Sequence, residues 1–354
     1  EVYNYREIRD ELQKLRYRFQ TDTDTEVIVN LYQHMGLECL SELNGMFAFA
    51  IYDLKKKKIF VARDRFGIKP LYYLNNKSEF IFSSELKGLL AHPHVNPTIS
   101  ADAIDLYLTM EYVPAPFTIY KEIKKLEQGH YLLWSREGLE RRKWYEYSYQ
   151  PKVFLKSDRE YVEKLDHLIA SSVKLRTRSD VPLGCFLSGG LDSSLITYYL
   201  SNSADIPLKT FNIAFEDSSF DESEYANIVG RHLGTDHNSE VFSASKMLEI
   251  LPSVWGMMDE PFADASLLPT FLLSHFTRSR VTVALSGDGG DEVFAGYPTY
   301  LAHKLAKWIP DWTIPFIKYG SNCLPVNFNN ISFDFKAKQF CKGLGHNPAL
   351  RHQY

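Results

Sequence analysis

The segment "VPLGCFLSGGLDSSLITYYL" (Val181–Leu200) joins an apolar run to a helical pattern through a Ser-Gly-Gly turn. The apolar residues of Pro182 to Leu187 predict a buried strand, and the spacing from Ser193 to Tyr199 predicts a helix. Glycine permits positive φ and lets the backbone approach an anion closely. The first amides of the following helix point outward with the positive end of its dipole. The segment is therefore typical of a phosphate-binding loop at the carboxyl end of a strand in an open α/β sheet.

This loop has neither the Gly-Lys-Ser/Thr ending of a P-loop nor the Gly-x-Gly-x-x-Gly pattern of dinucleotide sites. The candidate hydrogen-bond donors to a phosphate are the hydroxyls of Ser188, Ser193 and Ser194 and the backbone around Gly189 and Gly190. Asp192 would repel a phosphate unless a divalent cation such as Mg²⁺ lay between the carboxylate and the phosphate oxygens. The alternative is a plain Gly-Gly turn with an Asp or Ser helix cap.

A second acidic loop, "ALSGDGGDEVFAGYP" (Ala284–Pro298), follows the apolar strand pattern of Val281–Leu285. It combines small residues with carboxylates, namely Ser286, Gly287, Asp288, Asp291 and Glu292. Taken alone, such a loop is most often only a turn. If its strand lies near the first one, Asp192 and Asp291 could share one magnesium ion.

Strand and helix patterns alternate in the second half of the chain. Strands are predicted at Pro182–Leu187, Leu208–Phe215, His237–Phe242 and Val281–Leu285, with helices at Arg159–Val173, Ser193–Tyr199, Glu222–Leu233 and in stretches up to Phe276. Helices of this length between strands predict a parallel, doubly wound sheet.

The first half has a β-rich texture. A helix is predicted over Tyr5–Phe19, with Ile8, Leu12 and Leu15 on one face, and another ends at Gly36. Hairpins are predicted at Met46–Gly67, around a solvated turn at Lys55–Lys58, and at Lys69–Glu85, around Asn75 and Asn76; strands follow near Tyr131–Trp134 and Arg142–Tyr145. We therefore expect an antiparallel first domain at residues 1–150 and an α/β second domain at residues 155–354, joined near residues 150–158.

The composition fits an ordinary globular protein, because 45% of the 354 residues are hydrophobic and 24% are charged. The net charge of −4 favours neither a nucleic-acid nor a membrane partner. No run approaches the roughly 18 apolar residues of a spanning helix, and no signal peptide is evident. The four scattered cysteines are expected to be free thiols in a cytoplasmic protein. Histidines such as His92, His94, His232 and His237 have no ligand-like neighbours in the sequence, so we interpret them as structural or surface residues.

Several segments together carry a family resemblance. "FLSGGLDSS" and "LSGDGGDEVFAGY" resemble the pyrophosphate loop and second nucleotide loop of glutamine-dependent asparagine synthetases. In the first half, "EVYNYREIRDEL", "TDTDTEVI", "LNGMFAFAIYD", "ARDRFGIKPLYY" and "FSSELKGLL" are similar to that family's amide-transfer domain and occur in the same order. The resemblance extends over nearly the whole chain.

This resemblance implies two modules. The first would be the α/β/β/α glutaminase of N-terminal-nucleophile hydrolases, and the second an ATP pyrophosphatase. In such enzymes a carboxylate attacks the α-phosphate of ATP, pyrophosphate leaves, and ammonia then displaces AMP from the acyl-adenylate. The absence of a Walker lysine fits this reaction, because no γ-phosphoryl group is transferred. ATP and Mg²⁺ are the implied cosubstrate and cofactor.

The resemblance also assigns site residues. Pyrophosphate would be bound by Ser188, Gly189, Gly190, Asp192, Ser193 and Ser194, and the AMP portion would contact Phe186 or Leu187, Ile213, Ser286 and Gly287. Asp192 and Asp291 would be the magnesium ligands. Asp288 matches an acidic position needed for adenylate formation, where many members have Glu. Glu1 and Asp24 match positions that bind the polar groups of glutamine, although Asp24 could instead be a helix N-cap.

Three departures from the family pattern bear on activity. The family's nucleophile, a cysteine at the mature N-terminus, would precede Glu1, and a catalytic lysine segment would follow Tyr354. We therefore expect a fragment that lacks part of both domains and is impaired alone. In "DEPFADASLLPTFLLS" (Asp259–Ser274), no arginine stands where well-studied members have a Thr-Thr-x-Arg aspartate site. The identity of the acceptor carboxylate thus stays open.

Three functions are compatible with these observations. The first is an asparagine synthetase, the second an ATP-dependent amidotransferase acting on another carboxylate in envelope or natural-product synthesis, and the third a truncated nucleotide-binding copy without turnover. The expected partners are small-molecule substrates, with no nucleic acid and no membrane, and a homodimer is kept open. Other ATP pyrophosphatases share the first loop but lack the "MFAFAIYD" and "RDRFGIKPLYY" segments.

Overall fold

The computed structural model describes residues 1–354 except 77–78, 151, 204–205, 328–331 and 352–354. Its backbone contacts divide the chain into two compact units. The first comprises Glu1–Arg178 together with Ser253–Leu267, and the second comprises Ser179–Pro252 together with Leu268–Tyr354. No helix in the described part of the chain is both long and apolar enough to cross a membrane.

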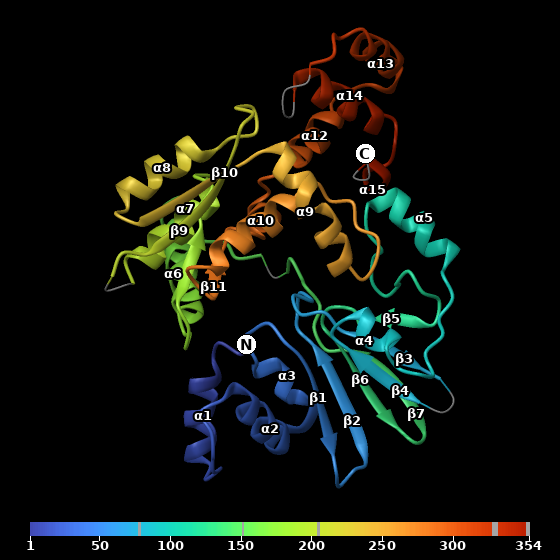
Figure 1. The fold of residues 1–354 in the computed structure, drawn as a ribbon, viewed down its shortest axis with the longest axis vertical. Helices are drawn as coiled ribbons and strands as arrows, with labels where there is room; N and C mark the ends of the chain where they lie inside the picture. Colours follow the sequence, from blue (N-terminus) through green and yellow to red (C-terminus); the bar gives the residue numbers. More distant parts are fainter. Residues whose placement is uncertain (77–78, 151, 204–205, 328–331, 352–354) are drawn as a thin grey trace. The chain divides into compact units, whose positions relative to one another are not determined.

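The chain up to Arg178 is built from short helices and two antiparallel sheets (Figure 1). Its elements are α1 (Tyr5–Lys14), α2 (Asp24–Met35), the 3-10 helix η1 (Gly36–Glu38), α3 (Cys39–Glu42), β1 (Ala48–Asp53), β2 (Lys58–Arg63), β3 (Tyr72–Asn75), β4 (Phe80–Ser83), α4 (Leu86–Leu90), α5 (Ala101–Met110), β5 (Ile123–Lys125), β6 (His130–Ser135), β7 (Gly138–Lys143) and α6 (Asp158–Arg176). The larger sheet has the order β1-β2-β6-β7, and the smaller one the order β4-β3-β5.

Alternating side chains on β2 show how the layers of the first unit are stacked. Phe60 and Ala62 pack into a core with residues of α1, α2 and α3. Val61, between them, points to the other face of the sheet and contacts Tyr73 of β3 in a second core. Leu74, next along β3, belongs to a third core with residues of α4. Because side chains alternate between the two faces of a strand, these cores define four layers, helix–sheet–sheet–helix, as predicted.

The chain from Ser179 onward forms a parallel sheet with helical connections (Figure 1). Its elements are β8 (Leu183–Phe186), α7 (Leu191–Ser201), β9 (Lys209–Phe215), α8 (Ser223–His232), β10 (Asp236–Phe242), α9 (Ala244–Met257), α10 (Leu267–Arg278), β11 (Val283–Leu285), α11 (Gly290–Phe294), α12 (Pro298–Ala306), the 3-10 helix η2 (Asp311–Thr313), α13 (Ile314–Asn322), α14 (Phe333–Gly343) and α15 (Pro348–Arg351). The sheet order is β10-β9-β8-β11, and every pairing is parallel. The doubly wound prediction is confirmed.

The predicted extent of two elements is wrong. Helix α1 ends at Lys14 and not at Phe19, because Arg16 adopts the left-handed conformation (φ 68°) and the Tyr17 N–H donates to the carbonyl of Leu12 (3.0 Å). Leu15 is consequently 55% exposed instead of sharing the apolar face of Ile8 and Leu12. The last strand of the first unit, β7, ends at Lys143, since the following amides donate to the carbonyl of Gly129.

The two predicted hairpins are present. Strands β1 and β2 pair from Ala48↔Arg63 to Asp53↔Lys58, and the lysine turn between them is held by Asp53, whose Oδ1 accepts the N–H groups of Lys55 and Lys56. Strands β3 and β4 pair from Tyr72↔Ser83 to Asn75↔Phe80, so Asn75 ends β3 instead of lying in the turn, while Asn76 follows it as predicted; residues 77–78 lie outside the described residues. All four cysteines are free, as predicted.

Candidate nucleotide site and glutamine pocket

The predicted loops both leave the carboxyl end of the parallel sheet. Strand β11 pairs directly with β8, with Leu285 opposite Cys185, so the loops that follow the two strands emerge side by side. In chain order the strands lie 3-2-1-4, and the direction of winding reverses between β8 and β11. Open α/β sheets bind their ligands at this reversal point, outside the carboxyl ends of the strands.

Asp192 lies where the two loops meet. It is in the first turn of α7, and its carboxyl group fills the space beside Gly290, the residue before Asp291. A Cβ atom added to Gly290 would lie 2.5 Å from Asp192 Cγ, and one added to Gly287 would lie 2.8 Å from the Ser193 nitrogen. Both distances are below 3.0 Å, so a side chain at either position would force the neighbouring atoms to shift. The condition for the shared-magnesium hypothesis, that the strands lie near each other, is met.

The serines of the first loop are joined by hydrogen bonds. Ser188 Oγ lies 3.0 Å from Ser193 Oγ, which also donates to the carbonyl of Gly190 (3.2 Å). The Gly190 N–H donates to Ser188 Oγ (3.2 Å). Ser194 differs, because its hydroxyl oxygen is buried and has no hydrogen-bond partner among the described residues. Buried hydroxyl groups are rarely left in this state.

Gly189 is the position of the loop that requires glycine. Its φ is +82°, and an added Cβ would lie 2.5 Å from the backbone nitrogen of Ala226 and 2.5 Å from Tyr225 Cβ. Both neighbours belong to α8, whose first turns thus lie directly against the loop. The positive φ and the close approach together explain the first glycine of the Ser-Gly-Gly turn.

The second loop is acidic and partly self-bonded. Ser286 Oγ donates to Asp288 Oδ2 (2.8 Å), and the hydroxyl of Tyr297 donates to Glu292 Oε1 (2.8 Å). This bond to Glu292 raises the pKa of Tyr297 to about 12. Asp192, Asp288 and Asp291 form no ion pair within the described part of the chain (Lys, Arg or His within 4.0 Å). Such uncompensated carboxylates match the oxygen ligands that Mg²⁺ prefers.

The residues predicted to contact AMP lie along the same edge. Phe186 ends β8 opposite Phe211, and the Leu187 N–H donates to the carbonyl of Phe211 (2.9 Å). Ile213 follows two residues later on β9; its side chain is buried with Phe242 and Leu272. Leu187 is also buried, with 1% of its surface exposed.

The two predicted glutamine-binding residues share a pocket in the first unit. Glu1 and Asp24 line a cavity of about 340 Å³, whose other walls include β1, Lys69 and Ser84. Asp24 Oδ2 accepts the N–H of Val2 (3.0 Å), so its carboxylate is tied to the chain segment next to Glu1. The cap hypothesis for Asp24 is wrong: the N-cap of α2 is Thr23, whose hydroxyl accepts the N–H of Glu26, and Asp24 is the first helical residue.

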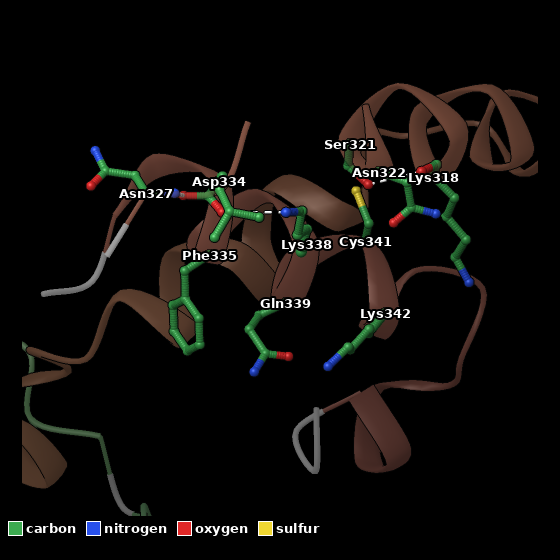
Figure 2. Close-up of a pocket in the computed structure, with 11 residues that line it drawn as sticks. Lys318, Ser321, Asn322, Asn327, Asp334, Phe335, Lys338, Gln339, Cys341 and Lys342 are labelled. Atoms are coloured by element: carbon green, nitrogen blue, oxygen red, sulfur yellow. Dashed lines mark hydrogen bonds and ion pairs between the residues drawn. The ribbon is translucent and has the colours of Figure 1, made fainter. Parts of the chain in front are cut away.

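A second pocket, of about 440 Å³, contains none of the predicted site residues. It lies between α13 and α14 and is lined by Lys318, Ser321, Asn322, Val326, Asn327, Asp334, Phe335, Lys338, Gln339, Cys341 and Lys342 (Figure 2). Its buried carboxylate, Asp334, accepts hydrogen bonds from Ser332 Oγ (2.7 Å) and Lys338 Nζ (3.3 Å). The charge of Lys338 is therefore neutralised within the pocket.

Sequence reasoning missed two features of the first unit. Asp64 is 1% exposed and accepts four backbone N–H groups, and the segment "DEP" (Asp259–Pro261) lies in the first unit. The statement that His92 and His94 lack ligand-like neighbours is also wrong, because both converge with Glu79. Glu79 lies 13 residues before His92, so no local spacing could have indicated this. His237 Nδ1 lies 2.9 Å from Thr210 Oγ1, and its Nε2 is buried without a hydrogen-bond partner among the described residues.

Comparison with known families agrees with this two-module layout. A family model for a glutamine amidotransferase domain matches residues 1–145, and one for asparagine synthase matches residues 164–348. The chain thus joins a glutamine amidotransferase domain to an asparagine synthase domain built on a parallel sheet. The chain belongs to the asparagine synthase family.

Curated relatives show the same relationship. The chain is 43% identical over 85% of its length to a putative glutamine-hydrolysing asparagine synthetase 2 of Methanocaldococcus jannaschii, of which 58% is covered. It is 37% identical over 85% of its length to asparagine synthetase 1 of Bacillus subtilis, of which 47% is covered. A third relative, amidase chyE of Penicillium rubens, is 29% identical over 97% of this chain and covered over 52%. The chain spans about half the length of these relatives.

Proposed function

We propose that the full-length protein is a glutamine-dependent asparagine synthetase. The side-chain carboxylate of aspartate attacks the α-phosphorus of ATP, and the bond to pyrophosphate breaks. Ammonia released from glutamine then attacks the acyl carbon of the adenylate, and AMP leaves with the bonding electrons. The observation that carries this proposal is the contact between the two loops, with Asp192 against Gly290 at the reversal point of the sheet. The names of the asparagine synthetase relatives also support it.

Different residues at the sheet edge would have different roles in the synthetase reaction. The turn Ser188–Gly190 and the first amides of α7 would bind the leaving pyrophosphate, since they combine hydroxyls with a helix N-terminus. Asp192 and Asp291 would hold Mg²⁺, which neutralises phosphate charge when bound. Asp288, oriented by Ser286, would act in adenylate formation.

The pocket of the first unit is proposed to bind glutamine. A zwitterionic amino acid presents an ammonium group, and the carboxylates of Glu1 and Asp24 in a cavity of about 340 Å³ supply acceptors for it. Replacing Asp24 with Asn keeps an oxygen for the Val2 N–H but removes the charge. We expect the KM for glutamine to rise at least about tenfold, with ammonia-dependent synthesis unchanged. Loss of both activities would refute the glutamine role of Asp24.

The identity of the carboxylate that accepts the amide nitrogen is tested with the full-length gene product. ATP, Mg²⁺ and ammonia are supplied with aspartate or with other carboxylates, and pyrophosphate, AMP and amide product are measured. Aspartate should release pyrophosphate and AMP in equal amounts with asparagine. If another carboxylate gives these products and aspartate does not, the enzyme is a related amidotransferase; if none does, the chain binds nucleotide without turnover.

A substitution separates site chemistry from folding. Asp192→Asn should abolish magnesium-dependent pyrophosphate release while the thermal unfolding curve stays that of the wild type. Asp158→Asn is the matched control, because Asp158 also lies in the first turn of a helix and is exposed. Unchanged turnover of Asp192→Asn would refute the metal-ligand assignment.

A further inference from the structure

Three potential metal ligands converge on the surface of the first unit. Glu79, His92 and His94 each offer a ligand atom, and these atoms lie within 4.8 Å of one another. His94 Nδ1 is 2.7 Å from Glu79 Oε1, and the rings of His92 and His94 lie 5.4 Å apart and edge to face. None of these residues lines the pocket that contains Glu1 and Asp24. The cluster is therefore not part of that pocket.

The backbone holds Glu79 at a fixed position. The Glu79 N–H donates to Asn76 Oδ1 (2.8 Å), and the Asn76 N–H donates to the carbonyl of Glu79 (3.0 Å). Strand β4 begins at the next residue and pairs along its length with β3. The Glu79 carboxylate thus extends from a backbone segment that is held by hydrogen bonds at the start of β4.

The two histidines lie on a turn that is equally well anchored. The His92 N–H donates to the carbonyl of Leu89 (3.1 Å), and the Val95 N–H donates to the carbonyl of His92 (3.0 Å). Leu89 is fully buried and Val95 is 5% exposed, so both ends of the turn are held by the third core. Pro93, between the two ligands, has a restricted φ. Ligands on such rigid supports lose little conformational entropy when they bind an ion.

We propose that Glu79, His92 and His94 form a zinc-binding site with a fourth position open to water. Two imidazoles and one carboxylate are a known ligand set for Zn²⁺, which binds nitrogen and oxygen at about 2.0–2.2 Å. In a tetrahedral site donors at that distance from one ion lie about 3.3–3.6 Å apart, so the three side chains, whose ligand atoms lie within 4.8 Å of one another, would draw closer together around the ion. Mg²⁺ and Ca²⁺ are disfavoured because they select oxygen ligands. Zinc would replace the contact between His94 Nδ1 and Glu79 Oε1.

The exposure of the cluster indicates an exchangeable ion. The side chain of His94 is 70% exposed and that of Glu79 is 27% exposed, so an ion can enter from solvent without unfolding the chain. Once bound, it would link the β3–β4 hairpin to the turn after α4. Because an ion that binds only the folded state stabilises it, zinc should raise the melting temperature of the protein.

The test uses the full chain as Cys323→Ser, since Cys323 is the exposed cysteine and could bind zinc by itself. Metal-free protein in excess Mg²⁺, which occupies oxygen-only sites, is titrated with ZnCl₂ by calorimetry. We expect one equivalent to bind. His94→Ala and Glu79→Gln should each weaken binding about tenfold or more, because losing a direct ligand costs at least as much as losing an outer-shell partner. Both should also remove the zinc-dependent rise in melting temperature.

His167→Ala is the matched control, because His167 is an exposed histidine on α6 outside the cluster, and this variant should bind zinc as the parent does. Co²⁺ provides a second readout: the parent should develop the visible absorption of four-coordinate Co²⁺, and the Glu79→Gln/His94→Ala double variant should not. Equal zinc affinity of the parent and the double variant would overturn the proposal, as would the absence of any zinc binding by the parent.

Discussion

Gly287 and Gly290 allow the second loop to lie directly on the first. At both positions a side chain would overlap atoms of Asp192 or Ser193, whereas the same substitution at Gly256, in helix α9, would meet no atom within 4 Å. The difference is one of space and not of backbone conformation, because Gly290 begins a regular helical turn. The contact between the two loops thus depends on the absence of a side chain at each of these two glycines.

This contrast predicts the effect of Gly290→Ala. The added methyl group would have to displace the Asp192 carboxyl group, whose Cγ would otherwise be 2.5 Å away. We expect pyrophosphate release by the full-length enzyme to fall at least about tenfold, since displacements of about 1 Å cost this much or more. The control Gly256→Ala should retain activity and gain slightly in stability, because alanine favours helix. Full activity of Gly290→Ala would contradict the site geometry.

A second residue-scale prediction concerns Glu7 and pH. Arg178 donates to both carboxylate oxygens of Glu7 and lowers its pKa from 4.5 to about 2. The folded state therefore favours the ionised carboxylate, and the stabilisation is complete above pH 4.5 and lost as the pH falls toward 2. Because the Glu7 side chain is 54% exposed, the pair contributes no more than about 1 kcal/mol.

The measurement is the melting temperature of wild type and Glu7→Gln between pH 7 and pH 3. The two curves should differ by a constant amount above about pH 5 and converge at lower pH. A difference that is the same at every pH would show that the charge of Glu7 is irrelevant to stability.

At the scale of elements, the connection between β2 and β3 is organised by one buried carboxylate. Asp64 Oδ1 accepts the N–H groups of Phe66 (3.1 Å) and Ile68 (3.0 Å), while Oδ2 accepts those of Phe47 (3.2 Å) and Lys69 (3.0 Å). These bonds shape a loop without regular secondary structure and tie it to the start of β1. Lys69 also lines the pocket that contains Glu1 and Asp24, so the loop forms part of one of its walls.

Asp64→Asn should destabilise this loop. The new NH₂ group would face N–H donors and lose two of the four bonds, and hydrogen bonds to charged groups are worth about 1.5–3 kcal/mol each. We expect the free energy of unfolding to fall by about 3 kcal/mol or more in urea titrations. Asp10→Asn, at an exposed position of α1, is the control and should change it by less than about 0.5 kcal/mol. Equal stabilities of the two variants would refute this role of Asp64.

At the scale of the whole molecule, sequence order and compact units do not coincide. Ser253–Leu267 falls within the residues matched by the asparagine synthase model but belongs to the first compact unit. Asp259 Oδ2 accepts the Leu86 N–H (2.6 Å), and the Ala263 N–H donates to the carbonyl of Glu111 (2.8 Å). Glu260 forms an ion pair with Lys125, and both side chains are 14% exposed.

The pair Lys125–Glu260 provides a test of this arrangement. Burial raises the pKa of Glu260, so its charged form depends on the neighbouring lysine. Lys125→Met should cost about 3–5 kcal/mol, because a carboxylate is left buried without a counter-ion, and Lys125→Met/Glu260→Gln should cost less than the two single changes together. Additive costs in urea titrations would show that the two residues do not interact.

Much of the fold and of the candidate site could be predicted locally. The apolar runs of β1 and β2, the glycine-rich turn after β8 and the acidic turn after β11 all appear in short windows of sequence. Local patterns failed at one helix end and at one short strand. The end of α1 depends on the left-handed Arg16, and the short strand β5 exists because Ile123 and Lys125 pair with β3.

The sequence by itself determined the family, the helix–sheet–sheet–helix and parallel-sheet modules, and the residue types of both loops, because these depend on periodicity and on motifs of neighbouring residues. Only the tertiary structure decided that β11 lies beside β8, that Asp192 meets Gly290, and that Glu79 meets His92 and His94. Strand order and the packing of α4 follow from burying apolar faces contributed by distant parts of the chain. No local pattern contains that information.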